Sequence, residues 1–352
     1  MLGLSKSDQL FQILKDRIER MSDGSRFPSV REIMREYNVS QFTVTPAMTR
    51  LEDKKLIRRE VGKGTFVRKD GQQKPFTLYY FLPDWPDNLS HSLEHLAMQE
   101  ANARNYDYRR IIFDYRMDIY KDLPFGEADA IFINPANFNL STSQLEILRS
   151  APIPVIIKGT VPNLGLNYVG GDNFRAGSMA AEYFINQGHR KIAMLLSEPF
   201  GTTSHEMLQT YVACAERHGL EVIIIDCGTH YGEVSSLKAH NEMKKYLSEN
   251  SLDFSALYVT SDSSSLGALK AFAEENISVP DDVCVMGYGG SPSAALFHPS
   301  LSSISIPRER LVAGYYELLD ECLKTGNLHG NSRIVYPELI ERTSTMLKIN
   351  IT

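Results

Sequence analysis

The feature that most constrains the fold is an alternation of short apolar runs with helix-like segments from residue 77 onward. Strands that are separated by helices cannot pair as simple hairpins, so the pattern predicts parallel sheets covered by helices on both faces. The expected strands are Thr77–Leu82, Arg110–Phe113, Ala130–Ile133, Pro154–Ile157, Lys191–Leu196, Glu221–Ile225, Ala256–Val259 and Val283–Met286. The expected helices include Leu89–Asn105, Ser141–Ser150, Asn173–Gln187, Thr203–His218 and Ser263–Glu275.

The length of this region indicates two lobes. About 275 residues are more than one doubly wound sheet holds comfortably, and 43% hydrophobic residues in the chain is ample for sizeable cores. We therefore predict an α/β fold with two doubly wound parallel sheets. In such folds ligands bind at the carboxyl ends of the strands, and with two lobes the expected site lies between them.

The stretch Pro28–Val67 has a different pattern, which predicts a winged helix-turn-helix. Ser29 and Glu32 have the spacing of a capping box at the start of a helix. Asn38 can adopt the left-handed conformation that ends this helix, and Ser40 can cap the next one. Residues 56–61 and 65–67 alternate like strands around a Gly-Lys-Gly turn. Such a fold puts one helix in the major groove of DNA with a basic loop beside it.

The second helix of this stretch has two distinct faces. Its buried side carries Val44, Met48 and Leu51, and its outer face offers Gln41, Thr43, Thr45 and Arg50. A small helical bundle with a solvated charged face is the alternative. The ordered wing after the two helices favours DNA binding.

The charge of the chain is unevenly distributed. Residues 1–70 contain 15 basic against 10 acidic residues, a net charge of +5, whereas the rest has 22 against 33, a net charge of −11. A basic head on an acidic body fits local attraction to phosphate. Residues 68–75 are polar and end in a proline. We predict a head at 1–68, a linker at 69–75 and a body at 76–352.

Several other classes of protein are not favoured. The four cysteines are widely separated and form no CxxC pair, which is typical of buried thiols in a reducing cytosol. No apolar run is long enough to span a membrane, and the N-terminus has no signal-peptide profile, so we expect a cytoplasmic protein. His91, Glu94 and His95 spell H-x-x-E-H, but a metal site needs a third ligand elsewhere, and we predict no metal or cofactor. The glycine-rich Gly287–Gly290 lacks dinucleotide-binding spacing.

The head resembles the GntR-type winged-helix domain. The resemblance lies in Phe27–Glu32, Val39–Val44 and Gly62–Val67 and covers most of residues 8–67. It implies phosphate contacts by Ser29, Ser40, Thr43 and Thr65, a base contact by Arg31, and a minor-groove or phosphate contact by Lys63 and Gly64.

The reading helix departs from this family. The family usually has arginine where this chain has Gln41 and Thr45, and glutamine favours adenine geometrically. Pro46 follows directly, and a proline inside a helix removes a backbone hydrogen bond. Either the helix starts later than in the family or it bends.

The body resembles the LacI-type, periplasmic-binding-protein-like effector domain over about residues 76–345. The motifs that carry it are Asp172–Gly177, Gln187–Ile192, Ser261-Asp262, Leu266–Ala268, Val279–Val283, Gly287-Tyr288, Pro299–Ile304 and Glu341–Ser344. A head and body of these kinds occur together in a subgroup of sugar-responsive transcriptional repressors. The resemblance implies a homodimer in which each head reads one half-site of operator DNA.

The family's sugar clamp is missing from this sequence. Met207 stands where the family has an arginine, Ser261 where it has an asparagine, and Gly289 where it has an aspartate. A buried sugar hydroxyl left unpaired costs about 1–3 kcal/mol, so we predict no ordinary binding of a simple hexose or pentose.

Other candidate effector contacts follow from the strand ends. They are Asp84, Trp85, Asn134, Asn137, Lys158, Asp262 and Tyr288, together with Met207 from the clamp position. Trp85 could stack on a ligand or pack at a surface between lobes or subunits, and Lys158 could be a ligand contact or a solvated charge. Asp172 is expected to start the helix at Asn173 and not to contact ligand.

Two functional classes follow. The first is a sequence-specific transcription regulator, a repressor, with a small-molecule effector. The second is a solute-binding module or enzyme with an incidental DNA-binding head. The N-terminal winged helix and the lack of recognisable catalytic groups favour the first.

Overall fold

The computed structural model describes residues 5–60, 62–68, 75–84, 88–135, 140–159 and 164–346. The chain divides into two compact units, with the boundary between Phe76 and Thr77. Most of the expected linker lies outside the described residues, so the boundaries at 68 and 75 remain a prediction.

The first unit is a winged helix-turn-helix, as the sequence predicts. Its elements are α1 (Lys6–Glu19), β1 (Arg26–Phe27), α2 (Val30–Tyr37), α3 (Gln41–Asp53), β2 (Ile57–Glu60) and β3 (Gly64–Val67). The three strands form an antiparallel sheet in the order β1-β3-β2. One core holds the unit together, and it joins Leu14 and Ile18 of α1 to Val44, Met48 and Leu51 of α3.

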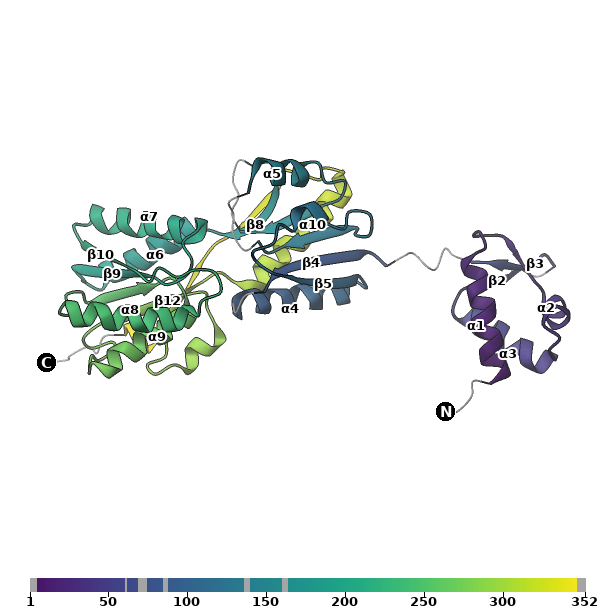
Figure 1. The fold of residues 1–352 in the computed structure, drawn as a ribbon, viewed down its shortest axis with the longest axis horizontal. Helices are drawn as coiled ribbons and strands as arrows, with labels where there is room; N and C mark the ends of the chain where they lie inside the picture. Colours follow the sequence, from purple (N-terminus) through teal and green to yellow (C-terminus); the bar gives the residue numbers. More distant parts are fainter. Residues whose placement is uncertain are drawn as a thin grey trace. The chain divides into compact units, whose positions relative to one another are not determined.

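The second unit contains two six-stranded sheets, one in each lobe (Figure 1). The first lobe has the strand order β14-β8-β7-β6-β4-β5 and is parallel throughout. Its strands are β4 (Thr77–Pro83), β5 (Asp107–Phe113), β6 (Ala130–Ile133), β7 (Val155–Lys158), β8 (Asn167–Gly171) and β14 (Ser332–Val335), and its helices are α4 (Asn88–Ala103), η1 (Tyr120–Asp122), α5 (Thr142–Arg149) and α10 (Arg308–Thr325). Helices α4 and α10 pack together, with the Tyr316 hydroxyl donating to the carbonyl of Ala97 at 2.6 Å.

The second lobe has the strand order β10-β9-β11-β12-β13-β15, in which only β15 is antiparallel to its neighbour. Its strands are β9 (Lys191–Leu196), β10 (Glu221–Asp226), β11 (Ala256–Val259), β12 (Cys284–Tyr288), β13 (Ser302–Ser305) and β15 (Glu338–Ile340), and its helices are α6 (Asn173–Asn186), α7 (Thr202–Arg217), α8 (Ser235–Glu249), α9 (Asp262–Glu274), η2 (Pro292–Leu296) and η3 (Thr343–Thr345). The predicted class of two doubly wound parallel sheets is confirmed.

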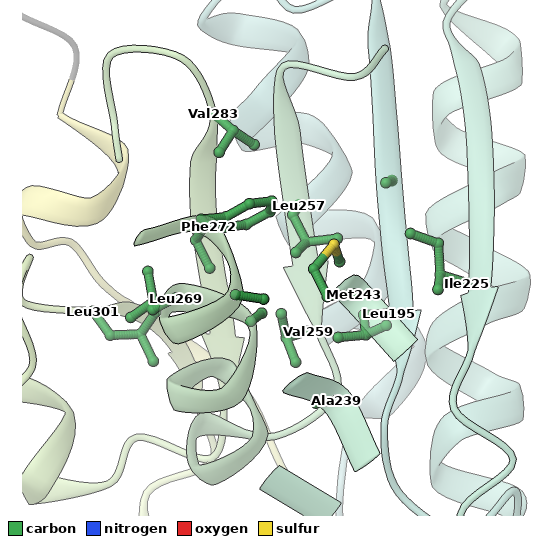
Figure 2. Close-up of a cluster of buried hydrophobic side chains, with 14 of the residues drawn as sticks. Leu195, Ile225, Ala239, Met243, Leu257, Val259, Leu269, Phe272, Val283 and Leu301 are labelled. Carbon is green, nitrogen blue, oxygen red and sulfur yellow. The ribbon is translucent and has the colours of Figure 1, made fainter. Parts of the chain in front are cut away.

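Helices cover both faces of the second sheet, and each face has its own core. Helices α6 and α7 cover one face, and α8 and α9 cover the other (Figure 1). Figure 2 shows the second of these cores, in which Met243 of α8 and Phe272 of α9 pack against Leu257 of β11. These apolar contacts explain why the strand runs of this lobe are almost continuously hydrophobic.

The chain passes between the lobes three times, after β8, after β13 and after β14. The crossings lie against one another. The backbone N–H of Asp172 donates to the carbonyl of Val335 at 2.9 Å. A side chain at Gly171 would meet Ile306 at 2.7 Å, so only glycine allows the first two crossings to pack this closely. The crossings after β13 and β14 belong to segments beyond the elements that the sequence pattern predicted.

Candidate nucleic-acid interface and effector site

The start of α2 is ordered by the predicted capping box. The backbone N–H of Glu32 donates to Ser29 Oγ at 3.3 Å, and the Ser29 N–H donates to Glu32 Oε2 at 2.6 Å. These hydrogen bonds hold the pKa of the Glu32 carboxyl below its usual range. Asn38 ends the helix in the left-handed conformation with φ of 50°, as expected. Beside the capping box, Arg31 is exposed and forms no ion pair with any described residue.

The start of α3 differs from the prediction. Ser40 occupies the N-cap position, but its side chain makes no capping hydrogen bond and lies 3.3 Å from Thr43 Oγ1. Ser40 therefore has the expected N-cap position but not the expected side-chain hydrogen bond. The helix begins at Gln41 and contains Pro46, so it does not start after the proline. Because proline has no N–H, the carbonyl of Phe42 lacks its regular helical donor.

The outer face of α3 is exposed at Gln41 and Thr45, with Thr43 half-buried. Arg50 does not belong to this face in the expected way. Its guanidinium is paired with Asp8 of α1 and lies 4.4 Å from the centre of the Phe11 ring. Its contacts are therefore inside the domain, and it is a link between α1 and α3. Its side chain is still 46% exposed, so the expected DNA contact of Arg50 remains a prediction.

The wing is a pair of antiparallel strands, β2 and β3, with Lys63 exposed at its turn. Lys63 Nζ lies 3.6 Å from Glu60 Oε2, an exposed pair that competes only weakly with phosphate. Gly64 has φ of +122°, which favours glycine at this point. Thr65 is buried in the sheet, where it pairs with Phe27 and Arg59, so the structure does not support its expected phosphate contact.

The candidates of the first lobe lie after its strands. Asp84 is exposed after β4, and its backbone N–H donates to the carbonyl of Phe113 at 2.7 Å. Lys158 is half-buried at the end of β7. Asn134 is buried after β6, and its Nδ2 has no hydrogen-bond partner among the described residues. Trp85 and Asn137 lie outside the described residues.

In the second lobe, the side chain of Asp262 is hydrogen-bonded to other residues of the same lobe. It begins α9 with only 3% of its surface exposed. Its two carboxylate oxygens accept from Ser303 Oγ at 2.7 Å and from the backbone N–H of Ser291 at 2.5 Å. Burial raises the pKa of this carboxyl, and the two hydrogen bonds oppose that rise. Asp262 therefore joins α9 to β13 and to the loop after β12.

Tyr288 is likewise held by a series of hydrogen bonds. Its hydroxyl donates to Asn173 Oδ1 at 2.8 Å, and Asn173 Nδ2 donates to Glu206 Oε2 at 2.9 Å. Burial raises the pKa of the Tyr288 hydroxyl. Asp172 caps α6 by accepting from the N–H of Arg175 at 2.8 Å, which confirms its expected role.

Met207 is not an effector contact in this structure. It is 1% exposed in the core between α6 and the second sheet, and the Tyr258 hydroxyl points to its sulfur at 3.3 Å. A side chain at Gly177 would lie 2.2 Å from the Met207 carbonyl, which shows how closely α6 and α7 pack. The prediction that Met207 lines the effector site is wrong, because the family resemblance gave its position along the helix but not the direction of its side chain.

Arg308, at the start of α10, was not predicted from sequence. Its Nη2 donates to the carbonyls of Gly290 at 2.9 Å and Gly289 at 3.4 Å, and its Nη1 donates to Ser92 Oγ of α4 at 3.5 Å. Arg308 thus connects the first lobe to the loop that contains Gly289 and Gly290 in the second lobe, which we call the glycine loop. The proline before it was the only local signal, and it says nothing about a partner so distant in sequence.

The glycine loop is closed on its own lobe. The N–H of Gly289 donates to the carbonyl of Ile304 at 2.9 Å, and the N–H of Gly290 donates to Ser303 Oγ at 3.0 Å. These backbone donors are therefore occupied and do not form a phosphate cradle.

Glu94 of the H-x-x-E-H motif in α4 contacts residues of the neighbouring strand β5. The carboxylate of Glu94 is buried, accepts from the Tyr108 hydroxyl at 3.0 Å and lies 3.5 Å from Arg110 Nη1. Across the described ranges, no three His, Cys, Asp or Glu side chains gather in a way that could hold a metal ion. The helices within those same ranges include none with the length and apolarity needed to cross a membrane.

Two protein families match separate parts of the chain. Residues 6–67 match "Bacterial regulatory proteins, gntR family", and residues 181–345 match "Periplasmic binding protein-like domain".

Two curated relatives extend these matches. The transcriptional regulator RegA of Clostridium saccharobutylicum is 24% identical over 336 residues, which cover 90% of this chain and 99% of the relative. The transcriptional repressor PurR of Edwardsiella ictaluri is 26% identical over 200 residues, which cover 57% of this chain and 58% of the relative. This chain therefore spans less than two thirds of that PurR.

The fold also matches solved structures. The LacI family transcriptional regulator from Enterococcus faecium, whose structure contains ribose, superimposes with a TM-score of 0.66 at 19% identity, covering 77% of this chain and all of that one. At this identity the likeness concerns the fold alone. The chain thus combines a region that matches the gntR family of bacterial regulatory proteins with a region that matches the periplasmic binding protein-like domain.

Proposed function

We propose that this protein is a sequence-specific DNA-binding transcription regulator that acts as a repressor. The observation that carries the proposal is the first unit, in which α2, α3 and the wing leave Arg31, the outer face of α3 and Lys63 exposed. Two relatives described above carry the names of a regulator and a repressor, which supports the same function. The second class, a solute-binding module or enzyme with an incidental head, is not favoured by any of these observations.

The mechanism of DNA binding follows from the exposed groups. Helix α3 enters the major groove, and Ser29 and Ser40 at the two helix starts contact phosphate. Ser40 is suited to this because its hydroxyl does not cap its own helix. Arg31 reaches a guanine, where a bidentate contact discriminates by about 1–3 kcal/mol, and Gln41 is suited to adenine. Lys63 contacts the phosphates beside the groove.

The assembly that this mechanism requires is a cytoplasmic homodimer, because each head reads one half of a two-fold operator. The protein is not an enzyme in this proposal. The bodies hold the two heads at a separation that matches the half-sites.

The body senses a small effector between its lobes. Asn134 offers an unpartnered amide from the first lobe, and Arg308 already bonds the loop of the second. A ligand with acceptor groups would compete with the Gly289 and Gly290 carbonyls for Arg308. Any such competition would alter how the lobes close around the three packed crossings, and thereby the separation of the heads.

The effector is not a simple hexose or pentose held in the usual way. Met207 is buried in a core, and both carboxylate oxygens of the buried Asp262 accept hydrogen bonds, from Ser303 and Ser291. Isothermal titration of the full chain against a panel of monosaccharides is expected to show no micromolar binding. Micromolar binding of an ordinary hexose or pentose would overturn this part of the proposal.

The test of DNA binding is a gel shift with duplex DNA from upstream of the protein's own gene. Sequence-specific binding is expected, and it should weaken steeply with salt because phosphate contacts release counterions. Arg31→Ala should relax the base preference at one position, whereas Lys63→Ala should weaken binding to all sequences and lower the salt slope by about one. Absence of sequence-specific binding at moderate salt would favour the alternative class.

A further inference from the structure

Phe42, in the first turn of α3, has no role in the fold of the first unit. Its side chain is 94% exposed, more than any other large apolar side chain in the described part of the chain. The core of the unit is made by other residues, among them Val44 and Met48 of the same helix. A single exposed apolar side chain on a surface needs no explanation, but this one lies on the helix expected to read DNA.

Phe42 does not stand alone on this helix. Thr45, Pro46 and Thr49 follow it at three, four and seven residues, the spacing that places side chains on one helix face. All of them are exposed, and none carries a charge. We call these four residues the apolar stripe, because they carry the rings of Phe42 and Pro46 and the methyl groups of two threonines, whose hydroxyls are polar. It lies opposite the side of α3 that enters the core, so it faces away from the domain.

Pro46 makes the stripe costly to maintain. A proline in the interior of a helix removes a backbone hydrogen bond and costs helix stability. Most other residues at this exposed position would not lower the stability of the helix in this way. The ring of Pro46 adds apolar area one helical turn from Phe42, and this area is useful only if something apolar contacts it.

The exposed basic residues of the same domain indicate a negatively charged partner. Arg31 and Arg35 of α2, and Lys63 of the wing, are exposed on the same small domain. The expected base-reading arginines of α3 are replaced by Gln41 and Thr45, and Arg50 is turned to Asp8. The major groove of DNA combines negative charge with apolar groups, with phosphates along its rims and thymine methyl groups on its floor.

We propose that the apolar stripe, led by Phe42, reads thymine through contact with the C5 methyl groups in the major groove. The proposal rests on the function proposed above and adds thymine to the adenine that Gln41 of the same helix is expected to select. It replaces the arginine-to-guanine contacts of α3 with apolar contacts, while Arg31 and Lys63 supply the attraction to DNA. The stripe's alternative occupants, a second copy of the chain or another protein, are outcomes of the test.

The experiment begins with the full-length protein and a pool of random duplexes, from which a preferred site is selected. Each thymine of that site is then replaced in turn by deoxyuridine, which removes only the C5 methyl. Binding of the unmodified protein is expected to weaken about fourfold for each contacted methyl, from the free energy of burying one such group. Phe42→Ala should abolish the difference between thymine and deoxyuridine at those positions.

A matched control is available in the second unit. Phe200 is also an exposed phenylalanine, 56% exposed, and Phe200→Ala should leave the thymine preference unchanged. Melting followed by circular dichroism should show no change for Phe42→Ala, because the side chain has almost no contacts to lose. Sedimentation of both variants reports whether the stripe holds two copies together.

The outcomes separate this inference from the proposed function. If no site is selected from the pool, the proposed function fails. If a site is selected but no deoxyuridine substitution weakens binding, or if Phe42→Ala keeps the thymine preference, the inference is overturned and the proposed function survives. A change of oligomeric state in Phe42→Ala with an intact thymine preference also overturns it, in favour of a protein partner.

Discussion

Helices α3 and α9 begin in the same way but use their first residues differently. Each has a serine at the N-cap, Ser40 or Ser261, whose side chain makes no capping hydrogen bond. In α3 the next residues, Gln41 and Phe42, are exposed. In α9 the next residue, Asp262, is buried and bonded to two neighbouring segments.

The two helix starts differ in whether their side chains are free to contact a ligand. The head leaves its reading groups open, so DNA can bind without disturbing the fold of the domain. In the body, Asp262, Tyr288 and Arg308 are engaged in internal hydrogen bonds, so an effector that contacts them must replace these bonds. Under the proposed function, effector binding at these groups would therefore be coupled to the conformation of the body, whereas DNA binding would not change the fold of the head.

The largest expected effect comes from breaking the internal bonds at α9. Asp262→Ala leaves the Ser303 hydroxyl and the Ser291 N–H without their acceptor, and we expect it to lower the free energy of unfolding by about 1–3 kcal/mol. Gln41→Ala, the exposed counterpart in α3, should change it by less than about 0.5 kcal/mol. Urea unfolding of both variants measures the two values. Equal effects on the free energy of unfolding would contradict the contrast between the hydrogen-bonded Asp262 and the exposed Gln41.

A smaller effect distinguishes the two helix starts within the head. Ser29→Ala removes one half of a formed capping box and should cost about 1 kcal/mol of stability. Ser40→Ala removes no capping bond and should leave stability unchanged while weakening DNA binding. Thermal melting and gel shifts of the two variants provide the comparison. A loss of stability at Ser40 equal to that at Ser29 would show that Ser40 caps α3 in solution.

The smallest effect is a pH dependence confined to the second unit. Burial lowers the pKa of His189 below 6.5, and its Nδ1 lies 2.7 Å from Ser255 Oγ. Its other ring nitrogen is buried without a partner among the described residues. On acidification the unfolded chain takes up this proton first, so the stability of the second unit should fall as pH drops through 6.5 towards the lowered pKa.

Hydrogen exchange at several pH values can measure this dependence for each unit separately. The first 76 residues contain no histidine, so protection in the head should not change in this pH window. His189→Gln should flatten the response of the second unit. An unchanged response in that variant would assign the effect to other groups of the second unit.

Features that depend on neighbouring residues were predictable. The capping box at Ser29, the left-handed Asn38 and the capping Asp172 follow from spacings of a few residues. The alternation of runs predicted parallel sheets, because each apolar strand had to be covered on both faces. The strands β14 and β15 escaped prediction because they are short, half-exposed edge strands without a strong apolar pattern.

Features that depend on the direction of a side chain were not predictable. Arg50 and Met207 both lie on helices whose positions were expected, yet one binds α1 and the other enters a core. Arg308 bonds residues about 18 positions away in sequence and in the other lobe. Such contacts require the distances between elements, which no local pattern contains.

The sequence by itself therefore determined most of the helices and strands and which kind of domain each region forms. Those properties arise from local hydrogen bonding and from hydrophobic periodicity, both of which are readable over a few residues. Only the tertiary structure decided which polar groups are used up inside the protein and which remain free for a ligand. That division depends on packing, since packing committed Asp262 to its own lobe and left Phe42 exposed on α3.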